Sequence, residues 1–396
     1  ALWLRRLGGP GGEAPAAPDA GTPPAGEWRA AWISYIELQG MDYTSAEAFR
    51  AGAAAMMDRC AGLGLNTVIV QVRPFGDALY PSALFPWSHI CTGVQGVSPG
   101  FDPLDILLTE AHSRGLSFEG WINPYRLQAS AASPGTLAAD NLANTHPDWV
   151  AAAGGGLYLN PAIPEAAAYV VEGVAELVRT YPVDGVHFDD YFYPTTDPAI
   201  DAARFAASGA ADLAEWRRQN VTALVKAAHD AVKAADPTLR FGVSPQGNPD
   251  NDMSQQYSDV RGWLAADSED AVVDYLCPQL YWGYGYTLSN GSRRFAYENI
   301  LAEWLAMPRG SAALYVGLGA YRIGEGDGGS NGDSVSGWST GRALADQVGT
   351  LRAAGAGGYA LYRYGSLFQN TAWPQLAEAE CAALTAANAP DGGRAG

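Results

Sequence analysis

The sequence predicts a single α/β domain, a (β/α)8 TIM barrel with long strand-to-helix loops. After Trp28, a short β-rich run followed by a helical stretch recurs eight times, and this alternation is typical of a closed parallel barrel. Most of the runs are nearly continuous apolar segments, as expected of parallel strands that are covered on both faces. The connections from helix to strand are short, whereas long segments (74–101, 124–163 and 191–211) follow three of the strands. Because barrel sites lie at the carboxyl ends of the strands, the long loops mark the functional side.

The elements follow one another in a regular order along the chain. The eight predicted strands are Ala30–Tyr35, Thr67–Arg73, Ser117–Asn123, Gly185–Tyr191, Arg240–Gln246, Val273–Tyr281, Ala313–Gly319 and Gly358–Tyr364. The predicted helices lie near 45–62, 103–114, 165–180, 212–235, 255–266, 293–306 and 340–354, and a last helix follows Trp373.

Local signals support the helix boundaries. Thr44 precedes Glu47 by three residues, which is the spacing of a capping box. Pro103 and Pro164 stand where a first helical turn has no use for a backbone N–H. Gly115 follows the second helix, at a position where a left-handed residue is favoured.

Composition limits the classes of partner. The chain has 396 residues and a net charge of −18, with only 24 Lys and Arg residues. Nucleic-acid backbones require clustered positive charge, so nucleic acid is excluded as a partner. The sequence has no apolar run of about 18 residues, so it predicts no transmembrane segment.

The two ends of the chain differ in composition from the rest. Residues 1–27 are mostly Gly, Pro and Ala and predict a disordered leader or linker, residues 28–388 form the predicted barrel, and 389–396 form a disordered tail. Arg5 and Arg6 fit what would remain behind an export signal or a membrane anchor.

Cofactor and metal motifs are missing from the sequence. The four cysteines lie far apart without a CxxC pair, which favours free buried thiols and leaves a Cys60–Cys91 bridge open. Glycine clusters do not follow a strand as a dinucleotide-binding motif does, and no G-x-S-x-G elbow occurs. We therefore predict no cofactor and no metal.

Polar residues collect on one face of several predicted strands. Reading each strand with a period of two places polar residues on one face and apolar residues on the other. The polar faces, which we expect to point into the barrel, are Gln71 and Arg73; Glu119, Trp121 and Asn123; His187, Asp189 and Tyr191; Ser244 and Gln246; and Cys277, Gln279 and Tyr281. Trp282, Tyr362 and Tyr364 add aromatic walls. Such a mixture of aromatic, amide and guanidinium groups suits a sugar ring, whose C–H faces need covering and whose hydroxyls need partners.

The motif DGVHFDDYFYP spans residues 184–194, across the fourth strand. Two adjacent carboxylates at the end of a barrel strand are costly unless something uses them. Alternation places Asp189 on the inner face, as a candidate nucleophile or transition-state stabiliser. Asp190 is expected to point away from the barrel axis, as a loop organiser or a support for the site, so the two are not expected to form a catalytic pair with each other. Asp184 is expected to be structural.

A glycosidase also needs a proton donor. Glu37, just after the first strand, and Glu119, on the inner face of the third strand, are the first candidates. Asp250 and Asp252, on the loop after the fifth strand, are further ones. The sequence leaves the choice among them open.

Several segments together resemble a known family. RAAWISYIE (29–37), NTVIVQVRPFGDALYPS (66–82), EGWINPYR (119–126), DGVHFDDYFYP and CPQLYW (277–282) occur in order at successive strand ends. They are similar to the glycosyl-hydrolase-like family ten proteins of bacterial cell envelopes. The family motifs contain Arg73, Asn123, Tyr125, Arg126, Asp189, Asp190, Gln279 and Tyr281.

The resemblance implies a barrel glycoside hydrolase that is exported, at the cell surface or lipid-anchored in the envelope. Some members act on peptidoglycan strands without stem peptides, so we expect an endo-acting enzyme on such strands. The alternatives are a non-catalytic glycan-binding barrel and a glycosidase of another polysaccharide. A catalytic barrel, unlike a glycan-binding one, requires a second carboxyl about 5–10 Å from Asp189 across the cleft.

Overall fold

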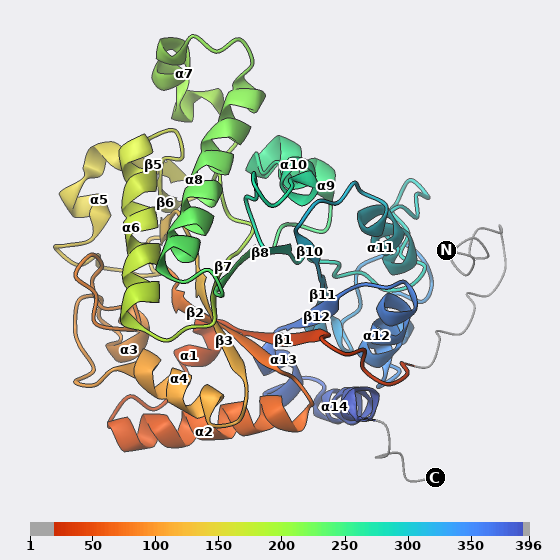
Figure 1. Cartoon of the computed structure of the whole chain (residues 1–396). Helices are drawn as coiled ribbons and strands as arrows, with labels where there is room; N and C mark the ends of the chain where they lie inside the picture. Colours follow the sequence, from red (N-terminus) through yellow and green to blue (C-terminus); the bar gives the residue numbers. More distant parts are fainter. Residues whose placement is uncertain (1–19, 391–396) are drawn as a thin grey trace.

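Eight segments of the chain form a parallel barrel in the computed structural model, which describes residues 20–390 (Figure 1). The strands are β1 (Trp28–Ile33), β2 (Thr67–Arg73), β3 (Ser117–Ile122), β7 (Gly185–Phe188), β8 (Arg240–Val243), β9 (Tyr275–Leu276), β10 (Ala313–Leu314), β11 (Val316–Gly319) and β12 (Gly358–Tyr362). Their order in the sheet is β10-β9-β8-β7-β3-β2-β1-β12-β11. Only Tyr315 separates β10 from β11, so the two ends of the sheet belong to one segment and the barrel closes there. The predicted fold is confirmed.

The predicted helices are present around the barrel. They are α2 (Ala46–Gly62), α4 (Pro103–His112), α6 (Pro164–Thr180), α8 (Leu213–Ala235), α10 (Val260–Ala265), α11 (Tyr297–Leu305), α12 (Ala343–Ala353) and α14 (Pro374–Asn388). Ser45, not Thr44, caps α2, since its hydroxyl accepts the backbone N–H of Ala48. Gly115, with a φ of +70°, has the expected left-handed conformation after α4.

Several strands end earlier than the sequence suggests, and three of these ends matter for the site. β7 stops at Phe188, β9 has only two residues, and β12 stops at Tyr362 before a short helix, α13 (Tyr364–Phe368). At these ends the chain turns into loops that carry functional groups, so the two-residue alternation no longer fixes the direction of a side chain. This affects the predicted positions of Asp190 and Tyr364.

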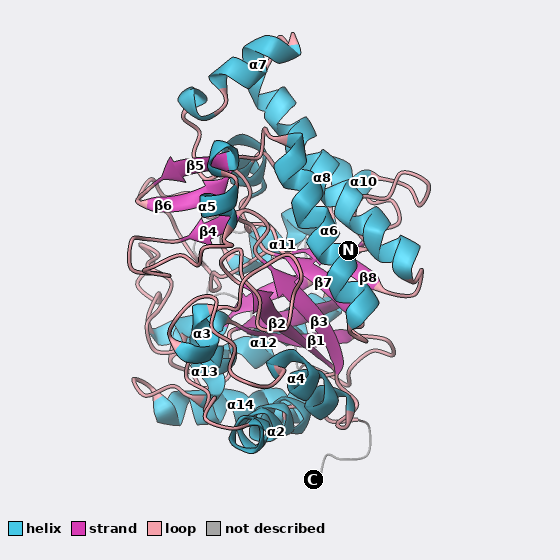
Figure 2. Ribbon diagram, turned by 90° about the vertical axis from the view of Figure 1, so that its left-hand side faces the viewer, coloured by secondary structure: helices cyan, strands magenta, loops and turns pink. Residues whose placement is uncertain are grey.

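The long loops contain structure that the sequence did not predict. The loop after β3 forms a small antiparallel sheet, β4 (Arg126–Gln128), β5 (Val150–Ala153) and β6 (Gly156–Leu159), which lies beside the barrel strands in Figure 2. Further short helices are α1 (Tyr35–Leu38), α3 (His89–Thr92), α5 (Leu142–Thr145), α7 (Ala202–Ser208) and α9 (Pro249–Asn251), and Asp252–Gln256 forms a π-helical turn. Single 3-10 turns lie at 147–149, 198–200, 320–322 and 336–338.

Two apolar clusters hold the barrel. A large one packs the outer faces of the strands under the helices. A smaller one fills the barrel interior, where aromatic residues dominate; its members are Trp28, Ala30, Trp32, Ile69, Trp121, Tyr275, Cys277, Tyr315 and Ala360. The interior is therefore a packed core, and ligands must approach from its ends.

The last residues of the predicted leader contact the barrel. Glu27 is buried, and Arg352 of α12 donates from Nε and Nη2 to its two oxygens, both at 2.8 Å. Arg352 also donates to the backbone carbonyl of Ala20 at 2.9 Å. Residues 1–19 and 391–396, which make up most of the predicted leader and tail, lie outside the described residues.

The structure places the cysteines apart. Cys60, Cys91, Cys277 and Cys381 are all free thiols, so no Cys60–Cys91 bridge forms. Within residues 20–390, His, Cys, Asp and Glu side chains form no group of three or more that could hold a metal ion. In the same range, no helix has the length and hydropathy needed to cross a membrane.

Candidate functional site

Asp189 lies at the carboxyl end of the barrel, which we call the mouth: the ends of the strands and the loops that follow them. It comes directly after β7 and is 5% exposed. Trp121 Nε1 donates to its Oδ2 at 3.0 Å, and the backbone N–H of Tyr191 donates to its Oδ1 at 3.3 Å. Both oxygens accept hydrogen bonds, so the group is held in one orientation.

The structure corrects the predicted orientation of Asp190. Instead of pointing away from the barrel axis, its Oδ1 accepts a hydrogen bond at 3.0 Å from Gln279 Nε2, beyond β9. Gln246, which follows β8, supplies a further side-chain hydrogen bond. Because β7 ends at Phe188, residues 189 and 190 no longer follow strand alternation. Both aspartate side chains therefore lie at the mouth. Asp189 contacts the β3 side, and Asp190 contacts the side of β8 and β9.

Burial raises the pKa of both carboxyls. For Asp189, burial and then the neighbouring charge of Asp190 raise the pKa to about 7, against the opposing effect of Arg126. For Asp190, burial raises the pKa, while the hydrogen bonds from Gln279 and Gln246 lower it. Two adjacent carboxyls that are both shielded from water do not ionise together easily, so the pair retains a proton up to higher pH than isolated aspartates would. The pair can supply a carboxylate and an acid at the same time.

Aromatic side chains form the wall of the mouth opposite the aspartates. Around the ring of strands, β12 lies across from β7, and its last residue is Tyr362. Its ring stacks on Tyr281, with centres 5.6 Å apart, and meets Trp32 edge-on at 5.9 Å. Tyr321 packs edge-on against Tyr281 and Tyr362. Aromatic faces with hydroxyl groups suit the C–H faces and hydroxyls of a sugar.

Tyr191 and Arg126 lie together at the rim of the mouth. Tyr191 is 52% exposed, and the guanidinium carbon of Arg126 lies 5.8 Å from the centre of its ring. Arg126 Nε donates to the backbone carbonyl of Pro74 at 3.1 Å, which fixes the guanidinium near the aspartates. The negative charge of Asp190 is the largest cause of a raised pKa at Tyr191. These two predicted binding residues are therefore close to the carboxyl pair.

Glu37 is not free to act as an acid. Its Oε2 accepts hydrogen bonds from the backbone N–H and the hydroxyl of Ser34, at 3.0 and 2.5 Å. Its Oε1 accepts from Arg363 Nη1 at 2.5 Å and from the backbone N–H of Gly365 at 2.8 Å. Oε2 thus completes the cap of α1, and Oε1 connects this helix to the segment that follows the last strand. The structure thus places Glu37 in a structural role.

Glu119 and His187 lie deeper in the barrel than predicted for site residues. Trp32 Nε1 donates to His187 Nε2 at 3.1 Å, so Nδ1 carries the proton and donates to the Tyr275 hydroxyl at 2.7 Å. The Tyr275 hydroxyl in turn donates to Glu119 Oε2. Burial lowers the pKa of His187 to about 3 and raises that of Glu119 to about 7. Both ring nitrogens of His187 are therefore occupied by protein partners, so neither is available to bind a substrate.

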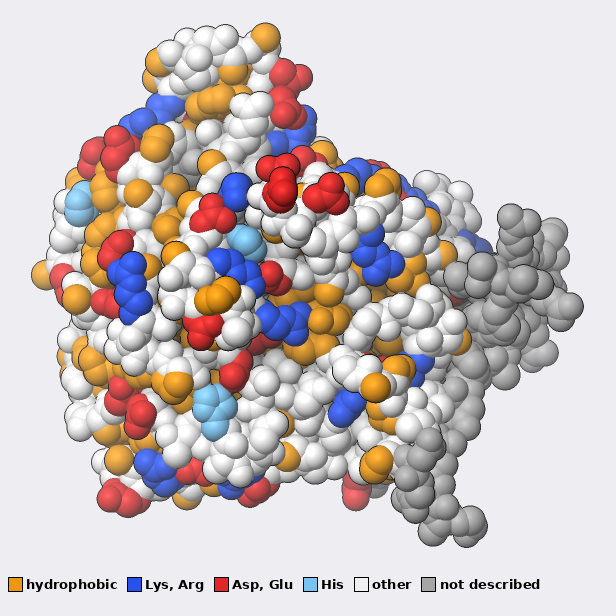
Figure 3. Space-filling view, in the orientation of Figure 1, with side chains coloured by type: hydrophobic (Ala, Val, Ile, Leu, Met, Phe, Trp, Pro, Cys, Tyr) orange, Lys and Arg blue, Asp and Glu red, His pale blue; other side chains and the backbone are white. Residues whose placement is uncertain are grey.

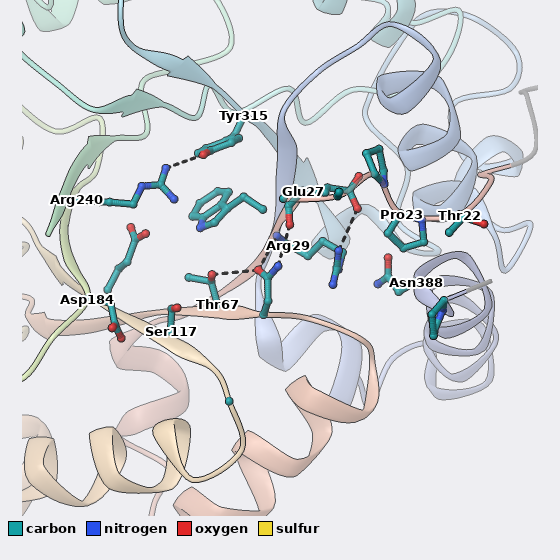
Figure 4. Close-up of a pocket in the computed structure, with 18 residues that line it drawn as sticks. Thr22, Pro23, Glu27, Arg29, Thr67, Ser117, Asp184, Arg240, Tyr315 and Asn388 are labelled. Atoms are coloured by element: carbon teal, nitrogen blue, oxygen red, sulfur yellow. Dashed lines mark hydrogen bonds and ion pairs between the residues drawn. The ribbon is translucent and has the colours of Figure 1, made fainter. Parts of the chain in front are cut away.

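The free side of Glu119 faces the amino end of the barrel. A cavity of about 680 Å³ opens there, lined by Glu119, Asp184, Arg240, Trp28 and Tyr315 among others (Figure 4). Arg240 Nη2 donates to the Tyr315 hydroxyl at 2.7 Å, one of the contacts drawn in Figure 4. Glu119 is thus one layer of side chains below Trp121 and at the opposite end from Asp189. The structure does not bring these two carboxyls together.

Arg73 points out of the barrel, contrary to the prediction that it shares the inner face with Gln71. The pairing of β2 with β3 is irregular between these two residues, which breaks the alternation. The guanidinium carbon of Arg73 lies 3.7 Å from the centre of the Phe85 ring, under α6. Burial lowers the pKa of Arg73. Its place is between the barrel and a helix, away from the mouth.

Two further predicted binding residues, Tyr125 and Tyr364, are packed rather than open, and a third, Trp282, is half-buried. Tyr125 is buried in the large core cluster. Tyr364 begins α13, and its hydroxyl accepts a hydrogen bond from Arg59 of α2 at 3.1 Å, so it faces the outer helices. Trp282 stacks on Phe295, with ring centres 5.0 Å apart, and is only half-buried. The predictions that Tyr125 and Tyr364 line the site are corrected.

Asn123 and Asp252 shape the loops of the site. Asn123 Oδ1 accepts the backbone N–H of Arg126 at 3.1 Å, which positions that residue. Asp252 is buried and its Oδ1 accepts the backbone N–H of Gln246 at 2.9 Å, behind Asp190. Asp250 instead forms exposed ion pairs with Arg294 and Arg261. Neither candidate acid, Asp250 or Asp252, is therefore open to the mouth.

Two aromatic residues of the mouth are absent from the sequence prediction. Trp32 is buried on the inner face of β1, and the same two-residue alternation, applied to the first strand, would have found it. Tyr321 lies in a turn after β11, where no periodic pattern indicates the direction of a side chain.

Charged groups are mixed over the surface. On the face drawn in Figure 3, Lys and Arg side chains are scattered among acidic and apolar ones and form no continuous basic surface.

Comparisons with known proteins point to one family. A family model described as Glycosyl hydrolase-like 10 matches residues 27–331. Glycosyl hydrolase YngK of Bacillus subtilis (strain 168) is 37% identical over 323 residues, which cover 75% of this chain and 61% of YngK. Glycosyl hydrolase DigH of Escherichia coli (strain K12) is 36% identical over 299 residues, which cover 68% of this chain and 65% of DigH. The chain thus spans less than two thirds of the length of either relative.

Solved structures share the fold. An alpha-L-fucosidase, isoenzyme 2 from Paenibacillus thiaminolyticus, superposes with a TM-score of 0.58 at 16% sequence identity, covering 90% of this chain and 49% of the fucosidase. This likeness concerns the barrel alone.

Proposed function

The chain belongs to the glycosyl hydrolase-like 10 family, and we propose that it is an endo-acting glycoside hydrolase of the bacterial cell wall. We propose peptide-free peptidoglycan strands as the substrate and, because that polymer lies outside the cytoplasm, an exported or envelope-bound location. The family membership and the aromatic wall of the mouth support a glycan ligand. The peptidoglycan substrate rests on the family resemblance of the motifs.

The observation that carries the proposal is the pair of adjacent carboxyls at the end of β7. Asp189 accepts hydrogen bonds at both oxygens and acts as the carboxylate that offsets positive charge at the anomeric carbon. Asp190 is half-buried, is held at Oδ1 by Gln279, and acts as the acid that protonates the leaving oxygen and then as the base for water. Glu37 and Glu119 are engaged elsewhere, so the second carboxyl of the site is Asp190.

Incubation of the protein with purified peptide-free strands, followed by mass analysis of the products, tests this function. We expect internal cleavage to short oligosaccharides by the wild type, and binding without cleavage by Asp189→Asn. Binding without cleavage by the wild type would indicate a glycan-binding barrel instead. Cleavage of another polysaccharide, but not of these strands, would reassign the substrate.

A further inference from the structure

The two aspartates rise from the same side of the mouth. They are consecutive residues, so their Cα atoms are about 3.8 Å apart, and both follow β7. A double displacement on an enzyme carboxylate needs an acid on one side of the scissile bond and a nucleophile on the other face of the sugar. Because both aspartates lie on one side, the nucleophile on the other face of the sugar must be a different group.

The wall opposite β7 offers no free carboxylate among the described residues that meet there. Tyr362, at the end of β12, packs with Tyr281 and Trp32. Glu37, a carboxyl whose charge reaches Tyr362, has both oxygens occupied by Ser34, Arg363 and Gly365. A sugar bound between the aspartates and the tyrosines would meet aromatic rings on its far face.

We infer that the nucleophile comes from the substrate, as the 2-acetamido group of the sugar on the non-reducing side of the cleaved bond. The inference rests on the proposed function, since wall glycans are built of 2-acetamido sugars. Asp189, beside the indole of Trp121, accepts the acetamido N–H and turns the carbonyl oxygen toward the anomeric carbon. Asp190 serves as the acid and base.

The proposed reaction consists of bond exchange and proton transfer, so it requires neither an oxidant nor a cofactor. The acetamido oxygen forms a bond to the anomeric carbon as the glycosidic bond breaks, and the leaving oxygen takes the proton of Asp190. The resulting cyclic oxazolinium ion is positively charged, and the Asp189 carboxylate faces it. Water then attacks the anomeric carbon and gives a proton to Asp190, which restores the acetamido group and retains the anomeric configuration.

Three preparations of the same peptide-free strands test this assignment with the full chain. The first is native, the second is chemically de-N-acetylated, and the third is de-N-acetylated and then acetylated again as a control for chemical damage. We expect the second to be cleaved more slowly by a factor on the order of 10²–10⁴, because the internal nucleophile is lost, and the third to regain the native rate. Proton NMR of the first products should show retention.

Equal cleavage of native and de-N-acetylated strands, or inversion at the anomeric carbon, overturns the inference and leaves the proposed function intact. Failure to cleave any preparation overturns both.

The thiazoline of N-acetylglucosamine, a stable mimic of the oxazolinium ion, provides a second measurement. It should inhibit the wild type and Glu119→Gln, a matched change at the other end of the barrel, and should bind Asp189→Ala at least about tenfold more weakly. Equal binding to Asp189→Ala contradicts the role of Asp189.

Discussion

The two ends of the barrel each hold a buried carboxyl whose pKa is raised to about 7, Asp189 at the mouth and Glu119 at the amino end. Burial is the main cause at both. Glu119 terminates a chain of hydrogen bonds through Tyr275 and His187, inside a packed aromatic core. Asp189 has a second carboxyl beside it and the exposed Tyr191 next to that. A raised pKa therefore does not by itself identify a catalytic group; a place at the carboxyl ends of the strands and a partner for proton transfer do.

The two ends of the barrel should differ most in how substitution of their carboxyls affects the rate of hydrolysis. Asp189→Asn should raise the barrier to hydrolysis by roughly 4–7 kcal/mol, a rate loss on the order of 10³–10⁵, because Asn cannot offset positive charge at the anomeric carbon. The side chain keeps its volume, so the fold should be retained. Initial rates on peptide-free strands, with circular dichroism as the measure of folding, provide the check. Retention of more than about a tenth of the wild-type rate, a loss under ~1.4 kcal/mol, would contradict the central role of Asp189.

Asp190→Asn is the matched change on the adjacent residue. The structure places this carboxyl at the mouth, so we expect a loss on the order of 10²–10⁴, as for a general acid. A substrate with a good leaving group, such as an aryl glycoside, should recover much of that loss, because it needs little protonation. The same substrate should not rescue Asp189→Asn. Identical behaviour of both variants would indicate a disrupted loop instead of two chemical roles.

Most of the framework could be predicted from the sequence, but the orientation of several site residues could not. Strand and helix periodicity located the barrel because apolar faces must be covered. Alternation failed where hydrogen bonding becomes irregular: at the bulge before Arg73, after the early end of β7 at Asp190, and where α13 replaces a strand at Tyr364. Glu37 shows a second limit: its capping box with Ser34 is local and has a spacing that a sequence can reveal, whereas its ion pair with Arg363 joins segments far apart in sequence. Sequence patterns indicate which residues approach the mouth, and tertiary contacts decide which remain free.

Trp28→Ala should affect stability and not catalysis. The indole lines the amino-end cavity, is buried, and stacks on Tyr315 with ring centres 4.5 Å apart. Removing a large aromatic residue from a packed interior costs about 3–5 kcal/mol. Chemical denaturation should show this loss, while kcat of the folded variant on peptide-free strands stays within a few-fold of the wild type. A loss of activity without a loss of stability would mean that the amino end takes part in the reaction.

Glu119→Gln should change the pH dependence of stability. Because the pKa of Glu119 rises from 4.5 to about 7 on folding, the folded protein binds a proton more tightly than the unfolded chain. Its stabilising contribution is complete below pH 4.5 and is lost as the pH rises through about 7, a difference of about 3 kcal/mol. Gln is neutral throughout, so the variant should lose less stability over this range. Urea denaturation at several pH values measures the effect, and parallel curves for the two proteins would exclude it.

Tyr191→Ala should produce the smallest effect, and one confined to binding. The side chain is 52% exposed at the rim of the mouth and touches Arg126 through a cation–π contact at 5.8 Å. An exposed ring supports little core packing, so the free energy of unfolding should change by less than about 0.5 kcal/mol. If the ring covers a sugar, its loss should weaken binding of peptide-free oligosaccharides by about 1 kcal/mol, or roughly fivefold. Titration calorimetry with Asp189→Asn as the background prevents cleavage during the measurement. An unchanged affinity would move the binding surface away from this rim, toward Tyr281 and Tyr362 on the opposite wall.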